Sequence, residues 1–294
     1  MAIFSFKKRK ARALHKQAQI LSDAGNDDEA LVLYEKAIAL APEKAESHYN
    51  IGLIYKYRND WEKSYAFNAT ANELDPDDES ALWNLAIAAT ALRDWATARK
   101  AWKDAGISID NEEGPIEGDF GLTPVRLNPD GNAEVVWAQR IDPARARILN
   151  VPLPESGYFA GDIVLHDGAP VGYRMHGEIE KPVFNVLELF ERSALKTFKV
   201  TVKADGQSDI DELQAILEQR GMIAEDWTTN YRVLCQACSE GRPHDEHDTV
   251  DESIWISRHE IGVGASDETS LRGALQAWTD NEGRTIIEVT CVLE

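Results

Sequence analysis

The chain has 294 residues, of which 43% are hydrophobic and 28% charged, and its formal net charge is −20. These values are typical of a globular protein of two or three domains. No apolar run approaches the ~18 residues that a membrane span requires. The first ten residues place apolar side chains before basic ones, the reverse of an export signal, so we expect a cytoplasmic protein.

The negative charge is concentrated beyond the first third of the chain. Residues 1–108 carry 16 acids and 15 bases, residues 109–196 carry 15 and 8, and residues 197–294 carry 20 and 8. Such an acidic surface repels phosphate backbones, so nucleic acid is not an expected partner. A solubility role and a basic protein partner are both compatible with it. The basic cluster at residues 7–12 is interpreted as a solvated terminus, with attraction to a membrane surface as the alternative.

Residues 11–112 repeat with a period of 34. Small side chains recur where two helices must approach closely, and larger apolar side chains recur where they fill the space between helices. The first frame contains Leu14, Ala18, Leu21, Ala30, Tyr34, Ala37 and Pro42. The second contains His48, Gly52, Tyr55, Ser64, Asn68, Ala71 and Pro76. The third contains Leu82, Ala86, Ala89, Ala98, Trp102, Ala105 and Asp110. The pattern predicts three helical hairpins.

These motifs resemble the tetratricopeptide repeat (TPR) family, most closely in the second unit, which has His48, Gly52, Tyr55, Ala71 and Pro76. The third unit departs from the family, with Asp110 at the proline position and Ala89 at the aromatic one. The resemblance implies a short curved stack that binds a protein or peptide on its concave face. It places seven partner-binding residues, and Gln19 beside them, on that face. The seven are Arg12, His15, Tyr49, Leu53, Lys56, Trp83 and Ile87.

These aromatic and cationic side chains suit an extended peptide with an acidic end. The alternative is that Tyr49, Trp83 and Ile87 pack against a following domain of the same chain.

Residues 113–195 change to short strand-like runs separated by turns, which predicts a small β-barrel or sandwich. The expected strands are 122–127, 133–140, 145–150, 162–166 and 183–190, with a turn at 166–170. Three arginines between residues 140 and 147 suggest either an anion clamp or a surface ion-pair network with Asp142. Asp162, His166 and Asp167 suggest either acid/base chemistry or a turn with polar caps.

Residues 196–294 predict a ferredoxin-like α+β domain, in the order strand, helix, strand, strand, helix, strand. The expected strands are 198–202, 231–235, 254–263 and 285–293, and the helices, capped by Ser208 and Ser266, are 209–220 and 268–279. The whole chain is thus expected to be a multidomain α and α+β protein.

Four potential zinc ligands lie between the second and third of these strands, with the spacing Cys-x2-Cys-x5-His-x2-His: Cys235, Cys238, His244 and His247. Two thiolates and two imidazoles can close a tetrahedral site, which would be structural because no ligand position stays open. His259 is a spare candidate. The alternatives are a solvated loop with a buried cysteine, and a redox Cys-x-x-Cys, which ordinarily opens a helix.

The leading hypothesis is a non-enzymatic scaffold or adaptor that binds a protein through its repeats and carries a structural zinc. One alternative is an immunity protein that neutralises a basic toxin, by analogy with bacterial tetratricopeptide proteins with an extra C-terminal region, some of which accompany secreted toxins. The other is a zinc-dependent enzyme with an accessory repeat domain, in which Glu240, Glu246 or Glu260 acts as the base. The sequence contains no recognisable nucleophile elbow and no Gly-rich phosphate loop.

Overall fold

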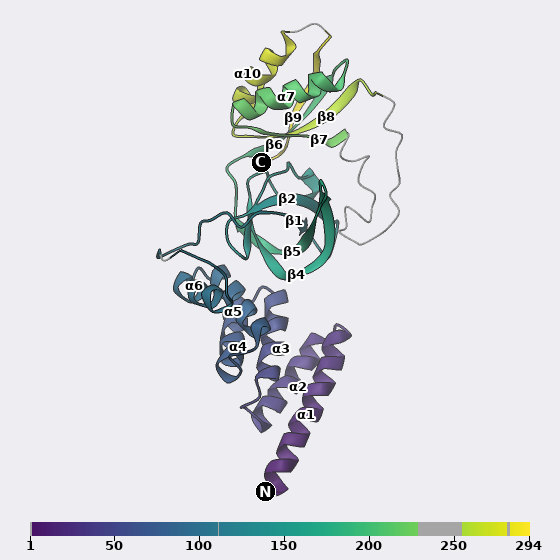
Figure 1. Cartoon of the computed structure of the whole chain (residues 1–294). Coiled ribbons are helices and arrows are strands. Elements are labelled where there is room, and N and C mark those ends of the chain that lie inside the picture. The colour runs from purple at the N-terminus through teal and green to yellow at the C-terminus, as the bar shows by residue number, and fades with distance from the viewer. Residues whose placement is uncertain (1, 111, 229–254, 281–282) are drawn as a thin grey trace. The chain divides into compact units, whose positions relative to one another are not determined.

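A computed structural model describes residues 2–110, 112–228, 255–280 and 283–294. The chain divides into two compact units, Met1–Glu117 and Gly118–Glu294, called here the helical unit and the β-containing unit (Figure 1). Each unit is described by itself. The finer division of the chain at residues 112 and 195 stays a prediction.

The described part of the helical unit consists of six α-helices, each in contact with the next along the chain. They form three consecutive hairpins (Figure 1). The helices are α1 (Ala2–Asp23), α2 (Asp27–Leu40), α3 (Ala45–Tyr57), α4 (Trp61–Leu74), α5 (Glu79–Ala91) and α6 (Trp95–Asp104). The three predicted hairpins are confirmed.

The turn inside each hairpin repeats with the same period as the sequence. Gly25, Asn59 and Arg93 lie 34 residues apart, and all three have a positive φ, of 78°, 55° and 58°. In each turn the next residue donates its backbone N–H to a carbonyl five residues earlier, as in a Schellman helix end. Asp60 and Asp94 then cap α4 and α6 with their side chains.

The recurring small residues lie where the two helices of a hairpin touch. Ala18 and Ala86 are fully buried, and Gly52 occupies the equivalent position in the second hairpin. A Cβ on Gly52 would lie 2.5 Å from the Nδ2 of Asn68 on α4. Asn68 is fully buried and donates a hydrogen bond from Nδ2 to the Ser64 carbonyl, 2.8 Å away. The second hairpin therefore closes only because residue 52 has no side chain.

Five strands of the β-containing unit form a closed barrel in the order β1-β2-β3-β4-β5. The pairs β1–β2, β2–β3, β3–β4 and β4–β5 are antiparallel, and β1 closes the barrel by pairing parallel to β5. The strands are β1 (Leu122–Leu127), β2 (Glu134–Arg140), β3 (Arg145–Ile148), β4 (Ile163–His176) and β5 (Ile179–Glu191). A short 3-10 helix, Pro154–Ser156, lies between β3 and β4. Alternate residues such as Val125, Val136 and Val164 fill the barrel core.

The turn predicted at residues 166–170 is wrong, because β4 continues through these residues to His176. The pairing of β4 with β5 shifts register between His166 and Pro170 and again between Pro170 and Gly172. These shifts absorb the turn-forming residues as bulges, which interrupt the ladder without ending the strand.

The rest of the β-containing unit is a four-stranded sheet in the order β7-β8-β6-β9, with two helices. Its elements in chain order are β6 (Lys196–Lys203), α7 (Gln207–Gln219), β7 (Ile223–Asp226), β8 (Arg258–Ala265), α10 (Glu268–Thr279) and β9 (Thr285–Leu293). The apolar stripe of α7, which includes Ile210, Leu213 and Leu217, packs with Phe198 and Trp278 in one core cluster.

Two details of this sheet differ from expectation. The strand after the first helix is β7, whereas the strand predicted at 231–235 lies outside the described residues. The predicted serine caps are also wrong, since Gly206 precedes α7 without a side-chain cap and Asp267 caps α10 by accepting from Ser270 N. Asp267 takes the role because its carboxylate is placed at the very start of the helix, where it also favours the helix dipole.

Candidate functional site

The predicted partner-binding residues lie on α1, α3 and α5, the first helices of the three hairpins. Side chains link these helices directly. His15 Nδ1 on α1 is hydrogen-bonded to Ser47 Oγ on α3 at 2.9 Å. Lys56 Nζ on α3 donates to Asn84 Oδ1 on α5 at 3.0 Å. The first helices thus form a connected row, called here the first-helix row.

Four of the seven residues combine exposure with a fixed position. Arg12 is exposed, while Tyr49, Leu53 and Trp83 are half-buried. The ring of Trp83 meets the fully buried Trp102 ring edge-to-face, with a centroid distance of 4.9 Å. Because α6 supplies Trp102, the second helix of the hairpin holds the Trp83 side chain in place.

His15 is half-buried, and its ring contacts Tyr34 edge-to-face at 5.4 Å. Burial lowers the pKa of His15, an effect that the nearby Glu46 carboxylate partly opposes. The imidazole is therefore favoured in its neutral form, and it serves the first-helix row as a hydrogen-bonding group more than as a cation.

Lys56 and Ile87 are not the exposed contacts that the sequence predicts. Their exposed fractions are 2% and 1%. Lys56 is engaged with Asn84, and its ammonium lies 4.5 Å from the centroid of the Tyr57 ring. Ile87 lies in α5, where every residue from Asn84 to Thr90 is buried. Lys56 therefore joins neighbouring hairpins, and Ile87 belongs to the interior.

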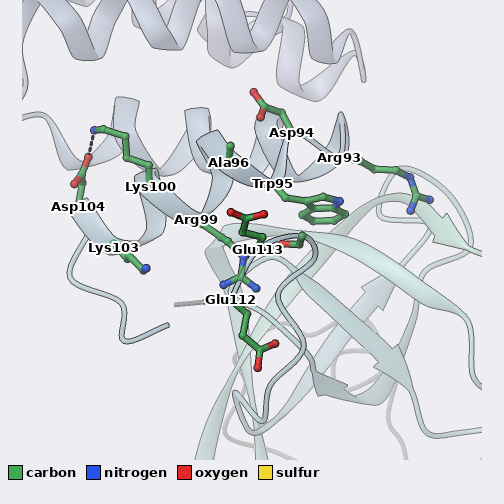
Figure 2. Close-up of a pocket in the computed structure, with 11 residues that line it drawn as sticks. Arg93, Asp94, Trp95, Ala96, Arg99, Lys100, Lys103, Asp104, Glu112 and Glu113 are labelled. Atoms are coloured by element: carbon green, nitrogen blue, oxygen red, sulfur yellow. Dashed lines mark hydrogen bonds and ion pairs between the residues drawn. The ribbon is translucent and has the colours of Figure 1, made fainter. Parts of the chain in front are cut away.

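A groove of about 770 Å³ lies on the outer side of the last hairpin, between α6 and residues 112–114 (Figure 2). Trp95 and Ala96 supply apolar surface, and apart from Gly114 the other lining residues are charged, with both signs. Lys100 is paired with Asp104 at 2.5 Å across one turn of α6. The groove is therefore a mixed polar surface without a dominant charge.

Arg99 forms the inner wall of this groove and holds the segment that follows α6. Its Nε donates to Gly114 O at 2.7 Å, and its two terminal nitrogens donate to Pro115 O at 2.9 Å and Asp110 Oδ1 at 2.6 Å. The side chain is only 8% exposed. An arginine can satisfy several carbonyl acceptors at once because its donors lie in a fixed plane. The sequence reveals no signal for this role.

All four predicted zinc ligands, Cys235, Cys238, His244 and His247, lie outside the described residues. Within the described ranges, no group of three or more His, Cys, Asp or Glu side chains is placed to hold a metal ion. His259, the spare candidate, is buried, and its Nδ1 lies 2.7 Å from Asp226 Oδ2.

The arginine segment and the neighbouring acids have structural partners. Asp142 is fully buried. Its carboxylate accepts hydrogen bonds from Arg145 Nε, at 2.5 Å, and from the backbone N–H of Ala144. Asp162, also fully buried, accepts from Ser193 N and from the Arg192 guanidinium, both at 2.7 Å. These contacts favour ion pairing and capping over an anion clamp or acid/base chemistry, although the pair of Arg145 and Asp142 is buried and is not the surface network that the sequence suggests.

Sequence reasoning missed a carboxylate pair that holds the segment between β3 and β4. Glu134 on β2 accepts from Leu153 N, at 3.1 Å to Oε2, and Glu225 on β7 accepts from Val151 N at 3.0 Å. Burial raises the pKa of Glu134 to about 8, and the Glu225 and Glu155 carboxylates add to the shift. Trp227, which directly follows β7, donates from Nε1 to Val151 O at 2.9 Å, so Glu225 and Trp227 bind the two backbone polar groups of the same residue. The segment thus connects the barrel to the four-stranded sheet.

Comparison with known proteins gives one family match, to the family described as "TPR repeat", over residues 18–57. Two similar solved structures are the second TPR of Spaghetti (RPAP3), at 18% identity, and the first TPR of the same protein, at 20%. The first covers 36% of this chain and 96% of its own, with a TM-score of 0.34. The other covers 33% and 78%, with a TM-score of 0.32. Both of those domains are described as bound to the HSP90 peptide SRMEEVD. No curated protein matches the chain.

The matched residues span the last six residues of α1, all of α2 and all of α3. Beyond this match the helical unit repeats the positive-φ turn at Asn59 and Arg93 and the buried small residue at Ala86, each at the interval of 34 residues. None of the helices in the described part of the chain has both the length and the apolar character needed to cross a bilayer. Residues 18–57 thus match the tetratricopeptide repeat family, and the hairpin features of the matched segment recur through the helical unit.

Proposed function

We propose that this chain is a non-enzymatic, cytoplasmic adaptor that binds an extended peptide segment of a partner protein on its first-helix row. The observation that carries the proposal is the row itself. Arg12, Tyr49, Leu53 and Trp83 keep exposed surface there, on helices that His15 and Lys56 fasten together. A surface held rigid before binding loses less conformational entropy when a peptide docks on it.

The chemistry of the row favours a peptide with an acidic group next to an apolar one. Arg12 is exposed and offers a planar set of donors that match a carboxylate. Leu53 and Trp83 offer apolar surface beyond it. The burial of Lys56 removes one of the two cations predicted for this face, so Arg12 becomes the main determinant of acidic preference.

The test is a display selection on the immobilised full chain, using a library of random peptides with free acidic C-termini. Selected peptides are then measured by fluorescence anisotropy against paired variants. Arg12→Glu is compared with Lys36→Glu, a charge reversal on the exposed face of α2. Leu53→Ser is compared with Leu74→Ser, a partly exposed leucine at the end of α4.

We expect Arg12→Glu and Leu53→Ser to weaken binding by about tenfold or more, which corresponds to at least ~1.4 kcal/mol. Lys36→Glu and Leu74→Ser should leave it unchanged. Equal losses in both members of a pair would show that peptides bind elsewhere, and a selection without enrichment would refute the adaptor proposal.

Two finer assignments belong to the same proposal. The first is a ferredoxin-like arrangement of residues 196–294. It is supported by the sheet order β7-β8-β6-β9 and by the position of α7 after β6 and of α10 after β8, which is the split β-α-β pattern. A structural zinc bound by Cys235, Cys238, His244 and His247 is supported by the ligand types and their spacing in the sequence.

A further inference from the structure

The first turns of α1 lie beyond the packed part of the helical unit. α1 has 22 residues and its partner α2 has 14, so at 1.5 Å per residue α1 is longer by about 12 Å. Phe6 and the four residues after it are exposed, and burial begins at Ala11, which is 5% exposed. Figure 1 shows the N-terminal end of α1 extending past α2.

Dense positive charge begins in this overhang and continues into the next turn of α1, and it is called here the basic patch. It consists of Lys7, Lys8, Arg9, Lys10 and Arg12. The first acidic residue in the sequence is Asp23, so no carboxylate on the same turns neutralises the patch. One ion pair of the patch joins Lys8 to Glu43, 3.2 Å apart, with both side chains about half exposed. A pair that exposed contributes little, so the patch keeps most of its charge.

An exposed aromatic ring accompanies these cations. Phe6 directly precedes Lys7, and its exposed fraction is 68%. Burying a phenylalanine side chain is favourable by about 1.5–3 kcal/mol, so a ring left in water beside five cations is suited to a surface that is both anionic and apolar. A bilayer with anionic headgroups offers both, whereas the outer surface of a nucleic-acid duplex is mainly its charged backbone.

The acidity of the remaining chain is compatible with such a surface. With the patch contributing +5 to a net charge of −20, the other residues carry −25. At physiological ionic strength, charges more than ~8 Å from the surface are largely screened. Along α1 itself the first acid is Asp23, about 24 Å beyond Lys7 at 1.5 Å per residue, so it lies outside that distance when the patch meets headgroups.

We propose that the basic patch and Phe6 dock the end of α1 onto an anionic lipid surface. Contact at this end leaves the exposed residues further along the first-helix row in water. Arg12 belongs to both surfaces, so the test below leaves it unchanged.

The experiment is co-sedimentation of the full chain with sucrose-loaded vesicles, either phosphatidylcholine alone or phosphatidylcholine with 30% phosphatidylserine. The test variant is Lys7→Ala/Arg9→Ala/Lys10→Ala. Its matched control, Lys36→Ala/Lys44→Ala/Lys100→Ala, removes three exposed lysines from the same unit. Phe6→Ala is paired with Tyr57→Ala, which changes another exposed ring. Circular dichroism checks that each variant stays helical.

We expect binding to phosphatidylserine vesicles at least tenfold tighter than to neutral ones, falling steeply between 0.1 and 0.5 M salt. The Lys7/Arg9/Lys10 variant should lose this preference, and Phe6→Ala should weaken binding severalfold, while both controls bind like the parent. Equal binding to the two vesicle types, or a control that behaves like its test variant, overturns the proposal. So does a DNA duplex that binds as tightly as the vesicles with no effect of Phe6→Ala, because the patch would then be a general polyanion site.

Discussion

The contact between Gly52 and Asn68 makes a prediction whose sign depends on the structure. In an exposed helix, replacing glycine by alanine stabilises by roughly 0.5–1 kcal/mol, because alanine restricts the unfolded chain more. At residue 52 the new Cβ would lie 2.5 Å from Asn68 Nδ2, closer than side-chain carbons pack. Overpacking of a buried site typically costs about 1–3 kcal/mol. We therefore expect Gly52→Ala to destabilise the helical unit by about 1–2 kcal/mol.

Removing the Asn68 side chain should change the effect of Gly52→Ala from destabilising to stabilising. In an Asn68→Ala background the added methyl group has space, and the same Gly52→Ala change should stabilise by roughly 0.5–1 kcal/mol. The coupling energy between the two positions is then about 2 kcal/mol. Gly273 in α10 serves as the control, because a Cβ there meets only the flexible end of Arg220 at 3.5 Å. Gly273→Ala should be neutral or stabilising.

The assay is urea denaturation of the full chain, with hydrogen-exchange mass spectrometry of peptides from α3 and α4 for the helical unit and from α10 for the control. Peptide resolution is needed because the chain has two units and need not unfold in one step. If Gly52→Ala stabilised α3 and α4, or if Asn68→Ala left its effect unchanged, the steric explanation of the repeat's small position would be refuted.

Three further predictions follow from other contacts. Because Glu134 has a folded pKa of about 8, above its unfolded value, the folded state keeps a proton there that the unfolded state loses. Its contribution to stability is therefore complete below pH ~4.5 and declines as the pH rises to about 8. In urea denaturation at a series of pH values, Glu134→Gln should flatten the dependence of the unfolding free energy on pH in this range. An unchanged slope would contradict the prediction. Arg99→Lys keeps the charge but loses the planar donors to Gly114 and Pro115, so amide exchange at residues 112–117 should accelerate at least tenfold, while Lys100→Arg should not change it. Native mass spectrometry should detect one zinc per chain, lost in Cys235→Ser and Cys238→Ser but kept in Cys291→Ser, and a metal-free parent would remove zinc from the proposal.

The sequence predicts the elements whose patterning is local. The hairpins follow from a recurrence of small and bulky positions, and both α10 and β9 begin and end at the predicted residues. β4 is longer than expected because the turn-forming residues next to Pro170 are accommodated as bulges. β4 pairs with β5 on both sides of these bulges, and a local sequence pattern does not reveal that pairing. β7 is missed because its four residues are too few to show an alternating pattern.

The candidate site is predictable only in its outline. The sequence places the first-helix row on α1, α3 and α5, but it does not show that Lys56 meets Asn84, because that partner comes from the next hairpin, 28 residues away. The attachment of Val151 to Glu225 spans 74 residues and has no local signal at all. Long-range hydrogen bonds of this kind decide which polar side chains stay available, and periodicity carries no information about them.

The hold of Arg99 on the segment after α6 has a consequence for how this family of arrays grows in evolution. A duplicated 34-residue hairpin inserted between existing hairpins would find compatible faces on both sides. One added after Asp104 would have to break the bonds that Arg99 makes to Asp110, Gly114 and Pro115. Proteins descended from this chain should therefore gain hairpins between the existing ones. Arg99 and the segment that it binds should be retained after the last hairpin.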